Sequence, residues 1–300
     1  MKSHSINITM ATWNRVDLTR LCLERILATK LTNAIIHIID NGSIDDTRQY
    51  LSHISKINDN VKVSFFNKNY GVSVAANYGW SLTDCDYYIK IDNDILVLDE
   101  NWLDDLVSFS ERNKEVGMLG YKLLENEKHK STPVYLQSGD LFYEFPWCLG
   151  GIVLIPRKIH NQCGFWTEDY GCYGFEDIDY SNRVRIIGYR SGYHYNENAV
   201  KHLGYEADIN PVQEKLKHAC IHDVNKGEKL YLLNKFLFEE KIRDVKVPRK
   251  FLPIQNQSDI SFKINRDYSS ITKIQNELIR KVKYTKDGDK VSFDFNLLKS

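Results

Sequence analysis

The segment at residues 87–102 reads YYIKIDNDILVLDENW, and its first five residues form a short apolar, aromatic run typical of a buried β-strand. The run ends at two carboxylates separated by an asparagine, Asp92-Asn93-Asp94, before the sequence turns apolar again. Two carboxylates at positions i and i+2 just past a strand can bind one Mg²⁺ or Mn²⁺ ion, because these cations prefer oxygen ligands. The same pattern also occurs in solvated turns, so this segment by itself leaves both interpretations open.

The composition of the 300-residue chain argues against several classes of protein. Its 40 basic and 40 acidic residues cancel, so no global field attracts it to nucleic acid or to an anionic membrane. No apolar stretch reaches the ~20 residues that a membrane-spanning helix needs, and the N-terminus shows no signal segment. The six cysteines form no C-x-x-C pair, which indicates reduced thiols. We therefore expect a cytoplasmic protein, with peripheral contact at the inner face of the membrane as an open alternative.

The first 120 residues alternate between the period of a strand and the period of a helix. Short apolar runs predict strands at residues 6–12, 34–40, 61–66 and 87–91. Helical spacing between these runs predicts helices at residues 18–26, 45–57 and 71–82, the second of them capped by Ser43 or Asp45. This alternation predicts a parallel sheet with helices on both faces. Ligands bind at the carboxyl ends of the strands in such sheets, where Asp40 and Asp92 both lie.

The regular alternation ends after Gly120. Polar, alternating stretches at 121–147 predict a hairpin or a loop. The run CLGGIVLIP at 148–156 predicts a further buried strand. The segment at 175–190 has helical spacing, and Gly188 is expected to stop that helix. This region therefore adds a strand and a helix to the same α/β domain.

The composition changes again near residue 206. Lys, Asn and Glu become frequent, and helical periodicity extends over 207–243 before two prolines break it. We therefore expect one domain over residues 1–205 and a mainly helical C-terminal extension over residues 206–300. A role of this extension in homo-oligomerisation or in binding a partner is left open.

Several motifs occur in a set order along the chain. They are DNGSIDDT at 40–47, NKNYGVSVAANYG at 67–79, IDND at 91–94, GG at 150–151 and GFEDIDYSNRVRIIGY at 174–189. This ordered set resembles the family 2 glycosyltransferases of the GT-A fold, and TWNR at 12–15 resembles that family's opening Thr-Tyr-Asn-Arg motif. The resemblance covers residues 5–205 and implies an α/β, Rossmann-like domain with a mostly parallel central sheet and flanking helices. It implies a nucleotide-binding half over 1–120 and an acceptor-binding half over 121–205.

The resemblance implies a nucleotide-sugar donor and its binding site. Asp40 is similar to the aspartate that hydrogen-bonds the nucleotide base, although a cap of the following turn would use the same residue. Gly71 and Asn77 match the family signature N-x-G-x-x-x-A-x-N-x-G, with helix packing as the alternative. Ala76 departs from the family, which often has arginine there, so one phosphate contact is missing. The full predicted donor site comprises Thr12, Trp13, Arg15, Asp40, Asn41, Asn69, Gly71, Asn77, Asp92, Asn93 and Gly151.

The resemblance also implies a divalent metal, Mn²⁺ or Mg²⁺, beside the donor diphosphate. Asp94 resembles the direct metal ligand, and Asp92 would support the ribose or a metal-bound water. His202 lies 25 positions after Asp177, where members of the family often carry a metal-contacting histidine. A lone histidine is otherwise a surface or core residue. The predicted metal ligands are therefore Asp94, Asp92 and His202.

The acidic pair Glu176-Asp177 is the predicted catalytic group. Members of the family place an aspartate here, beside the acceptor hydroxyl whose proton it takes. Carboxylates at the start of a helix could instead complement the helix dipole. The preceding stretch GFWTEDYGCYGF at 164–175 resembles a sugar-binding wall, which favours the catalytic interpretation. We favour Asp177 as the base and Glu176 as the residue that orients it or binds the acceptor, but spacing alone does not separate these neighbours.

The sequence thus predicts a metal-dependent, inverting glycosyltransferase that moves a hexosyl or N-acetylhexosaminyl group from a nucleotide sugar, with UDP favoured. A glycan, lipid-linked or protein acceptor in polysaccharide biosynthesis is expected, whereas the neutral net charge disfavours nucleic acid. A nucleotidyltransferase is one alternative, but MATWNRVDL at 10–18 lacks the glycines of a phosphate loop. A non-catalytic sugar- or nucleotide-binding module is the other, and the combination of Asp94, Asp177 and His202 disfavours it.

Overall fold

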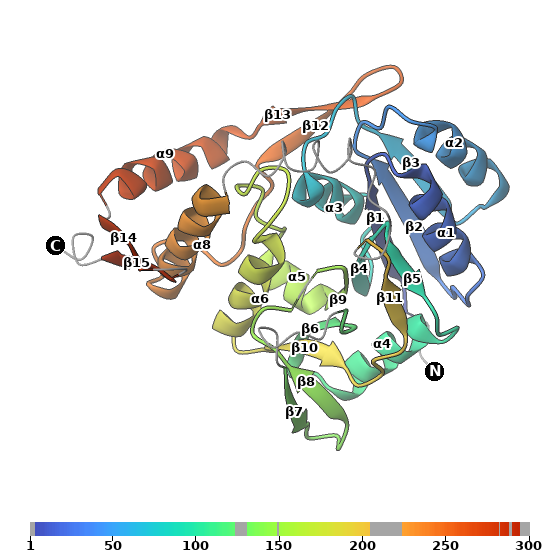
Figure 1. Cartoon of the computed structure of the whole chain (residues 1–300), viewed down its shortest axis with the longest axis horizontal. Coiled ribbons are helices and arrows are strands. Elements are labelled where there is room, and N and C mark those ends of the chain that lie inside the picture. The colour runs from blue at the N-terminus through green and yellow to red at the C-terminus, as the bar shows by residue number, and fades with distance from the viewer. Residues whose placement is uncertain are drawn as a thin grey trace.

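A computed structural model of the chain describes residues 4–123, 131–148, 150–204, 224–281, 283–287 and 290–294. One half of its central sheet consists of parallel strands in the order β3-β2-β1-β4 (Figure 1), namely β1 (Ile6–Thr12), β2 (Ala34–Asp40), β3 (Val61–Phe65) and β4 (Tyr87–Asp92). These four strands are those that the apolar runs predicted. At the end of β1, Thr12 pairs with Asp40 on one side and Ala11 pairs with Asp92 on the other. The two aspartates therefore lie at the same edge of the sheet, as predicted.

The other half of the sheet has mixed strand directions. It continues from β4 through β9 (Ile152–Pro156), β6 (Val116–Gly120), β10 (Arg190–His194), β8 (Leu141–Glu144) and β7 (Thr132–Tyr135). In the described part of this sheet, only β9 and β8 run against the other strands, because each is antiparallel to both neighbours. The prediction of a mostly parallel sheet is confirmed. The hairpin predicted within 121–147 is β7–β8, and the strand predicted within 148–156 is β9.

Helices cover both faces of the sheet, and each face has its own apolar core. One face is covered by α1 (Val16–Leu27), α2 (Thr47–Ile57) and α4 (Trp102–Arg112), and the other by α3 (Val72–Ser81), α5 (Arg157–Cys163) and α6 (Glu176–Ile186). Along β4, Ile89 and Ile91 pack in the first core and Tyr88 packs in the second. Because side chains alternate along a strand, Lys90 and Asp92 share the side of Tyr88, which is the side of α6.

Two ends of helices test the capping signals in the sequence. Asp46 is the N-cap of α2, one position beyond Asp45, but the Asp45 carboxylate accepts a hydrogen bond from Thr47 N at 3.1 Å. Ser43, the alternative cap, instead accepts a hydrogen bond from Asn14 N at 2.7 Å. At the end of α6, Gly188 adopts a left-handed conformation with φ +90°, as expected for a helix stop. The predicted cap of α2 is thus wrong by one residue if Asp45 is meant and by three if Ser43 is meant, and the predicted stop of α6 is confirmed.

A short two-stranded sheet links the end of β4 to a distant part of the chain. It pairs β5 (Ile95–Val97) with β11 (Val200–His202) in antiparallel fashion, and His202 is the partner of Ile95. Leu203 N donates a hydrogen bond to Asp94 O at 2.9 Å, which extends the pairing by one step. Because β5 follows Asp94 directly, this pairing brings His202 to the carboxyl end of β4.

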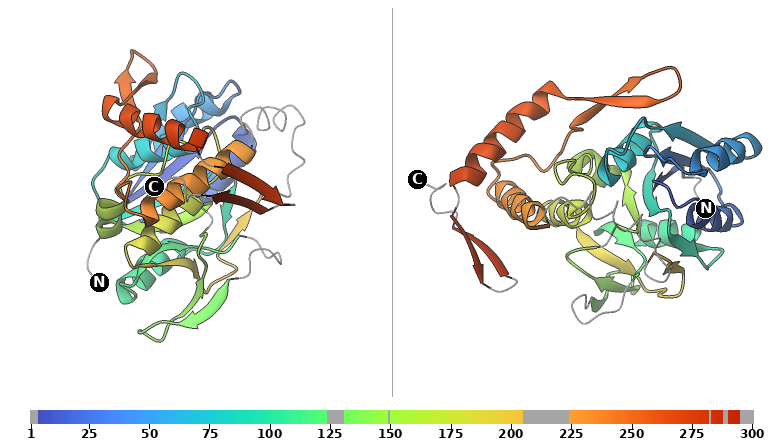
Figure 2. Two further views of the ribbon diagram at one scale, coloured as in Figure 1. Left: turned by 90° about the vertical axis from the view of Figure 1, so that its left-hand side faces the viewer. Right: turned by 45° about the horizontal axis from the view of Figure 1, so that its top comes forward.

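The C-terminal part of the chain mixes helices and hairpins. It contains α8 (Val224–Glu239), β12 (Phe251–Gln255), β13 (Ile260–Ile264), α9 (Arg266–Lys281), β14 (Lys283–Asp287) and β15 (Lys290–Asp294). Figure 2 shows α9 and the β12–β13 hairpin along one side of the molecule, with β14–β15 beyond them. The expectation of a mainly helical extension therefore missed two hairpins. The part of the predicted 207–243 helix that precedes Val224 lies outside the described residues. No helix in the described part of the chain is long and apolar enough to cross a membrane.

This C-terminal part packs against the first domain. Ile260 and Phe262 of β13 share an apolar core with Phe66, at the end of β3, and with Tyr78 of α3. The Phe66 and Phe262 rings meet edge to face with 4.7 Å between centroids. The hairpin therefore covers the outer end of the parallel half of the sheet.

Candidate active site

Asp94 is the centre of a group of side chains at the carboxyl end of β4. Its Oδ2 atom forms an ion pair with Arg15 Nη1 at 3.0 Å, and its Oδ1 atom lies 3.6 Å from His202 Nε2. Gly204 packs against the same group, and a Cβ atom at this position would clash with Asp94 Oδ2 and lie 2.7 Å from His202 Cε1. The structure thus brings together Arg15, Asp94 and His202, which the sequence assigned separately to donor and metal binding.

Asp92 has a different partner from Asp94. Its Oδ1 atom lies 2.5 Å from Lys90 Nζ, and the same ammonium group donates a hydrogen bond to Gly150 O. Lys90 is only 4% exposed. Burial alone would lower the pKa of Lys90, but the carboxylate of Asp92, followed by Glu176 and Asp177, raises it above its usual value. Lys90 is therefore a charged lysine among three acidic side chains.

The described residues partly fit the metal site that the resemblance implies. Within residues 4–123, 131–148, 150–204 and the described C-terminal segments, no group of three His, Cys, Asp or Glu side chains is arranged to hold a metal ion. Asp94 and His202 do approach each other, whereas Asp92 is engaged by Lys90. Protein sites for Mg²⁺ often supply only one or two ligands and leave the rest to water and substrate phosphates. Asp94 and His202 fit such a site, and the predicted set of three protein ligands is not assembled.

The acidic pair lies at the start of α6, with unlike environments for its two members. Gly150 N donates a hydrogen bond to Asp177 Oδ2 at 2.9 Å, and Asp177 is half-buried. Glu176 is 6% exposed. Burial, and next the neighbouring Asp177 carboxylate, raises the pKa of Glu176 to about 8. At neutral pH Glu176 is therefore mostly protonated.

The end of β1 and the turn after β4 are joined by buried polar contacts. Asn93 Nδ2 donates hydrogen bonds to Thr19 Oγ1 at 2.9 Å and to Thr12 Oγ1 at 3.3 Å, and the two threonine hydroxyls lie 3.0 Å apart. Thr12 is 2% exposed and Asn93 is 8% exposed. Both residues were predicted to bind the donor, and the structure uses their side chains to hold the turn that carries Asp94. Trp13, which follows Thr12, is half-buried beside them.

Asp40 lies at the end of β2 as predicted, with its carboxylate buried. Both of its oxygens accept from Ser43 N, at 3.2 and 3.3 Å, which is the turn cap that the sequence allowed as an alternative. Arg48 Nε lies 3.7 Å from Asp40 Oδ2, and Arg48 also pairs with Asp259 of the β12–β13 hairpin. Burial raises the pKa of Asp40, and the bonds from Ser43 and the charge of Arg48 oppose that rise.

The loop before α3 is held by the predicted asparagines. Asn41 accepts a hydrogen bond from Tyr70 N at 2.8 Å and donates one to Gly71 O at 3.1 Å, while Asn69 accepts one from Gly71 N at 2.8 Å. Gly71 has φ +97°, and a Cβ atom here would clash with Gly171 O. The glycine is therefore needed both for its left-handed conformation and for close contact with the loop before α6. This contact joins the donor-side loop to the acceptor-side loop.

Asn77 is fully engaged within the protein. Its amide nitrogen donates to Trp166 O at 2.8 Å and to Glu168 Oε1 at 2.7 Å, and its amide oxygen accepts from Trp166 N at 2.9 Å. The side chain has no exposed surface. The structure therefore supports helix packing, the alternative to donor binding, and Asn77 fastens α3 to the segment before α6.

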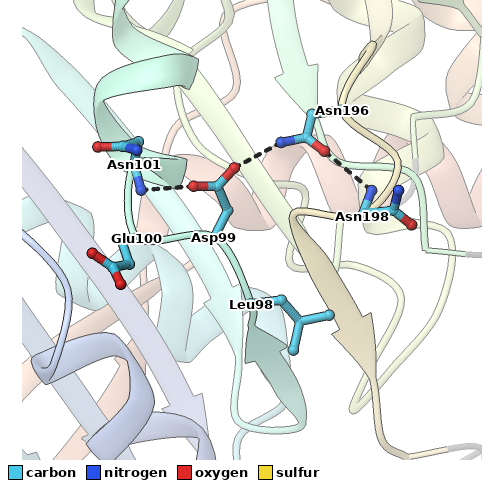
Figure 3. Close-up of a pocket in the computed structure, with 6 residues that line it drawn as sticks. All are labelled: Leu98, Asp99, Glu100, Asn101, Asn196 and Asn198. Carbon is cyan, nitrogen blue, oxygen red and sulfur yellow. Dashed lines mark hydrogen bonds between the residues drawn. The ribbon is translucent and has the colours of Figure 1, made fainter.

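A separate pocket of about 450 Å³ lies at the far end of the β5–β11 sheet from Asp94 and His202 (Figure 3). Its polar groups bind one another: Asp99 accepts hydrogen bonds from Asn196 Nδ2 at 2.8 Å and from Asn101 N at 2.9 Å. Asn196 Oδ1 in turn accepts from Asn198 N at 3.2 Å. Because these groups satisfy each other, we assign no chemistry to this pocket. Its lining consists of Leu98, Asp99, Glu100, Asn101, Asn196 and Asn198.

Three residues of the site were missed by the reasoning from sequence. Lys90 had a usable signal, because a lysine in the middle of an apolar strand needs a buried partner. Gly204 and Phe175 carry no such signal in the sequence. Gly204 matters only through its contact with Asp94, and Phe175 matters only through its backbone conformation. The predicted Gly151 lies beside Asp92, whose N–H donates to Gly151 O at 2.8 Å.

Known proteins similar to this chain are found among curated sequences and among solved structures. In curated sequences, the chain is 26% identical over 199 residues to poly-beta-1,6-N-acetyl-D-glucosamine synthase of Staphylococcus aureus, a match that covers 63% of this chain and 47% of that protein. It is 23% identical over 115 residues to an uncharacterized glycosyltransferase of Haemophilus influenzae, covering 38% of this chain and 35% of that protein. The chain thus spans less than half the length of these relatives.

Solved structures share the fold at low sequence identity. The mannosyltransferase PcManGT of Pyrobaculum calidifontis, in complex with GDP-Man and Mn²⁺, aligns with a TM-score of 0.58 and 14% identity over 82% of this chain and 66% of that one. TarS 1–349 of S. aureus, in complex with UDP-GlcNAc, aligns with a TM-score of 0.55 and 14% identity over 79% of this chain and 69% of that one. The chain therefore has the GT-A fold that these glycosyltransferase structures share.

The sequence itself narrows this class to one family. The family model described as "Glycosyl transferase family 2" matches residues 7–167, which is more than half of the chain. The chain belongs to glycosyl transferase family 2, and the resemblance of its ordered motifs is confirmed at the level of the family.

Proposed function

We propose that this protein is an inverting glycosyltransferase that moves a sugar from a nucleotide-diphosphate donor to an acceptor hydroxyl group. One observation carries the proposal: Gly150 holds the Asp177 carboxylate through its N–H group and the Lys90 ammonium group through its carbonyl. Lys90 in turn holds Asp92 at the end of β4. Gly150 therefore contacts both Asp177, the proposed base, and Lys90, which holds the end of β4 where we propose that the donor binds.

In the proposed reaction, Asp177 is the base. It takes the proton of the acceptor hydroxyl as that oxygen attacks the anomeric carbon, and the bond from this carbon to the donor phosphate oxygen breaks. The nucleoside diphosphate leaves with the electron pair, and this direct displacement inverts the anomeric configuration. Asp177 is favoured over Glu176 because it is half-buried, whereas Glu176 is buried and has a pKa of about 8. Protonated Glu176 serves as a hydrogen-bond donor that orients the base or the acceptor.

The donor phosphates are proposed to lie beside Asp94. Asp94 and His202 would hold a divalent Mn²⁺ or Mg²⁺ ion, which when bound neutralises the diphosphate leaving group. Arg15 adds a positive charge at the same place through its ion pair with Asp94. A UDP-linked donor is favoured from the sequence, and GDP-linked donors also belong in the test because PcManGT is in complex with GDP-Man.

The acceptor is proposed to be a glycan, with lipid-linked and protein acceptors as alternatives. The similarity to a poly-beta-1,6-N-acetyl-D-glucosamine synthase supports polysaccharide biosynthesis. The cytoplasmic location stays a prediction. Peripheral membrane contact and homo-oligomerisation also stay predictions.

The test is nucleotide release and sugar transfer from a panel of UDP-, GDP- and dTDP-sugars, with and without Mn²⁺. We expect turnover by the wild type with at least one donor. Asp177→Asn should lower the turnover number by about 10²–10⁴-fold, because this is the range lost with a general base. Its affinity for the nucleotide should stay within about twofold, since Asp177 acts on the acceptor. Asp104→Asn, an exposed carboxylate on α4, is the matched control and should keep full activity.

Two outcomes would contradict the proposal at different levels. If the wild type binds and turns over no nucleotide sugar under any metal condition, the proposed function is wrong. If Asp177→Asn keeps full transfer while Glu176→Gln loses it, the reaction stands and the base is Glu176.

A further inference from the structure

Tyr231 of α8 touches the segment that carries the acidic pair. Its ring stacks on that of Phe175 with 5.7 Å between centroids and 19° between planes, and Tyr231 is 8% exposed. The helix comes close at the same point, because a Cβ atom on Gly227 would lie 3.1 Å from the Phe175 ring. A helix from the C-terminal part of the chain therefore packs directly on the residue that precedes Glu176.

Phe175 has an unfavourable backbone conformation at a functional position. Its φ of +66° is in the left-handed region, which bulky residues rarely adopt. Phe175 is also the N-cap of α6, and its carbonyl accepts the hydrogen bond from Asp179 N at 2.9 Å. The direction in which Glu176 and Asp177 leave the loop thus depends on a strained residue that its surroundings must hold in place.

Tyr231 also reaches the second loop of the site. Burial raises the pKa of the Tyr231 hydroxyl group, and the Trp147 side chain beside it opposes that rise. Trp147 lies three positions before Gly150, whose N–H holds Asp177 Oδ2. One side chain on α8 therefore contacts both loops that position Asp177, the first through Phe175 and the second through Trp147.

We propose that Tyr231 is a positioning residue for glycosyl transfer: it holds the Phe175 turn and the Trp147 loop so that Asp177 faces the acceptor. This inference rests on the proposed function and adds to it a residue that lies outside the matched family region of 7–167. It assigns to α8 a part in the reaction rather than a role in partner binding.

The test compares the turnover number with the affinity for the nucleotide. Tyr231→Ala should lower the turnover number at least tenfold and change the dissociation constant of the nucleotide, measured by calorimetry with the released nucleoside diphosphate, by less than twofold. Tyr231→Phe keeps the ring and loses only the hydroxyl group, so it should recover most of the turnover. Lys235→Ala, an exposed position on the same helix, is the matched control and should behave as the wild type.

A double-mutant cycle tests whether Tyr231 acts through Phe175. If it does, Tyr231→Ala combined with Phe175→Ala should be no more than about twofold slower than the slower single variant, because the two changes remove one interaction. If the loss of turnover in the double variant equals the product of the losses in the two single variants, Tyr231 does not act through Phe175. Should Tyr231→Ala not fold, Gly227→Ala provides the second variant, since its added methyl group displaces the Phe175 ring and should also lower turnover without loss of nucleotide affinity.

The outcomes separate the inference from the function on which it rests. Unchanged turnover in Tyr231→Ala, or an equal loss of turnover and nucleotide affinity, would overturn the positioning role and leave the proposed function intact. Absence of turnover by the wild type with every donor would overturn both.

Discussion

Lys90 decides how the carboxylates at the end of β4 are used. It shares a face of the sheet with Asp92, and its ammonium group holds that carboxylate at 2.5 Å. Asp94 follows in the turn and pairs instead with Arg15 and His202. The motif Asp92-Asn93-Asp94 predicted one pair of metal ligands. The two aspartates instead have different partners and, as we propose, different roles.

The raised pKa of Glu176 predicts a specific dependence of stability on pH. In the folded protein Glu176 keeps its proton up to a pH of about 8, whereas in the unfolded chain an ordinary glutamate loses its proton near pH 4.5. Protonated Glu176 therefore contributes its full share to the free energy of unfolding below pH 4.5. This share is lost as the pH rises towards 8, at up to about 1.4 kcal/mol per pH unit. Glu176→Gln should gain stability relative to the wild type over this window, measured by urea unfolding at pH 5, 6.5 and 8. A difference in free energy of unfolding that does not change with pH would contradict the prediction.

At the scale of elements, the close contact between α3 and β1 positions the loop that carries Gly71. A Cβ atom on Gly79 of α3 would clash with the Thr9 side chain of β1, and Asn7 Nδ2 donates to Gly79 O at 3.0 Å. Two positions earlier in the same helix, Asn77 binds the segment before α6. The position of α3 is therefore set by contacts on two sides, one with the sheet and one with the acceptor side of the site.

The contact at Gly79 predicts that Gly79→Ala lowers the free energy of unfolding, although glycine to alanine inside a helix usually raises it. Glycine to alanine inside a helix usually stabilises a protein by about 1 kcal/mol. Gly79→Ala should instead destabilise this protein by about 1–3 kcal/mol, because the added methyl group overpacks the interface with Thr9. Asn276→Ala at an exposed position of α9 is the control for helix propensity, and it should raise the free energy of unfolding by about 0.5 kcal/mol. Urea unfolding measures both, and a stabilised Gly79→Ala protein would show that the helix can move away.

At the scale of the whole molecule, the C-terminal part is bound to the first domain by a buried polar network. Asp169, just before the α6 loop, accepts hydrogen bonds from Tyr268 and Gln275 of α9, at 2.8 and 3.2 Å. It also forms ion pairs with Arg243 and Lys250, each at 3.3 Å. The domain boundary near residue 205 stays a prediction, and this network joins the chain segments on its two sides.

This network predicts a large loss of stability from one residue. Asp169→Ala leaves the buried Arg243 without its carboxylate partner and should lower the free energy of unfolding by about 3–5 kcal/mol, since breaking a buried pair leaves an uncompensated charge. Lys30→Ala breaks an exposed pair with Asp104 and should cost no more than about 1 kcal/mol. Calorimetric unfolding of both variants measures the contrast. Equal small effects would mean that the C-terminal part docks only weakly.

Much of the fold was predictable from local patterns. Apolar runs of strand length and helical spacing depend on neighbouring residues alone, so they placed β1 to β4, β9 and α6 correctly, together with Asp40 and Asp92 at one edge of the sheet. The resemblance of the ordered motifs, confirmed by the family match, also identified Asp94, His202 and the acidic pair as residues of one region. The two C-terminal hairpins were missed because their strands carry mixed polar residues and each hairpin forms its own two-stranded sheet.

The sequence by itself determined the family, the order of the elements and the chemical types of the site residues, because each of these is written in short, contiguous patterns. Only the tertiary structure decided the partners of those residues. Lys90 meets Gly150 from 60 positions away and Asp169 meets Gln275 from 106 positions away. Contacts between distant segments depend on how the sheet and its loops pack, so they separated Asp92 from Asp94, gave Asn77 a structural partner and brought Tyr231 to Phe175.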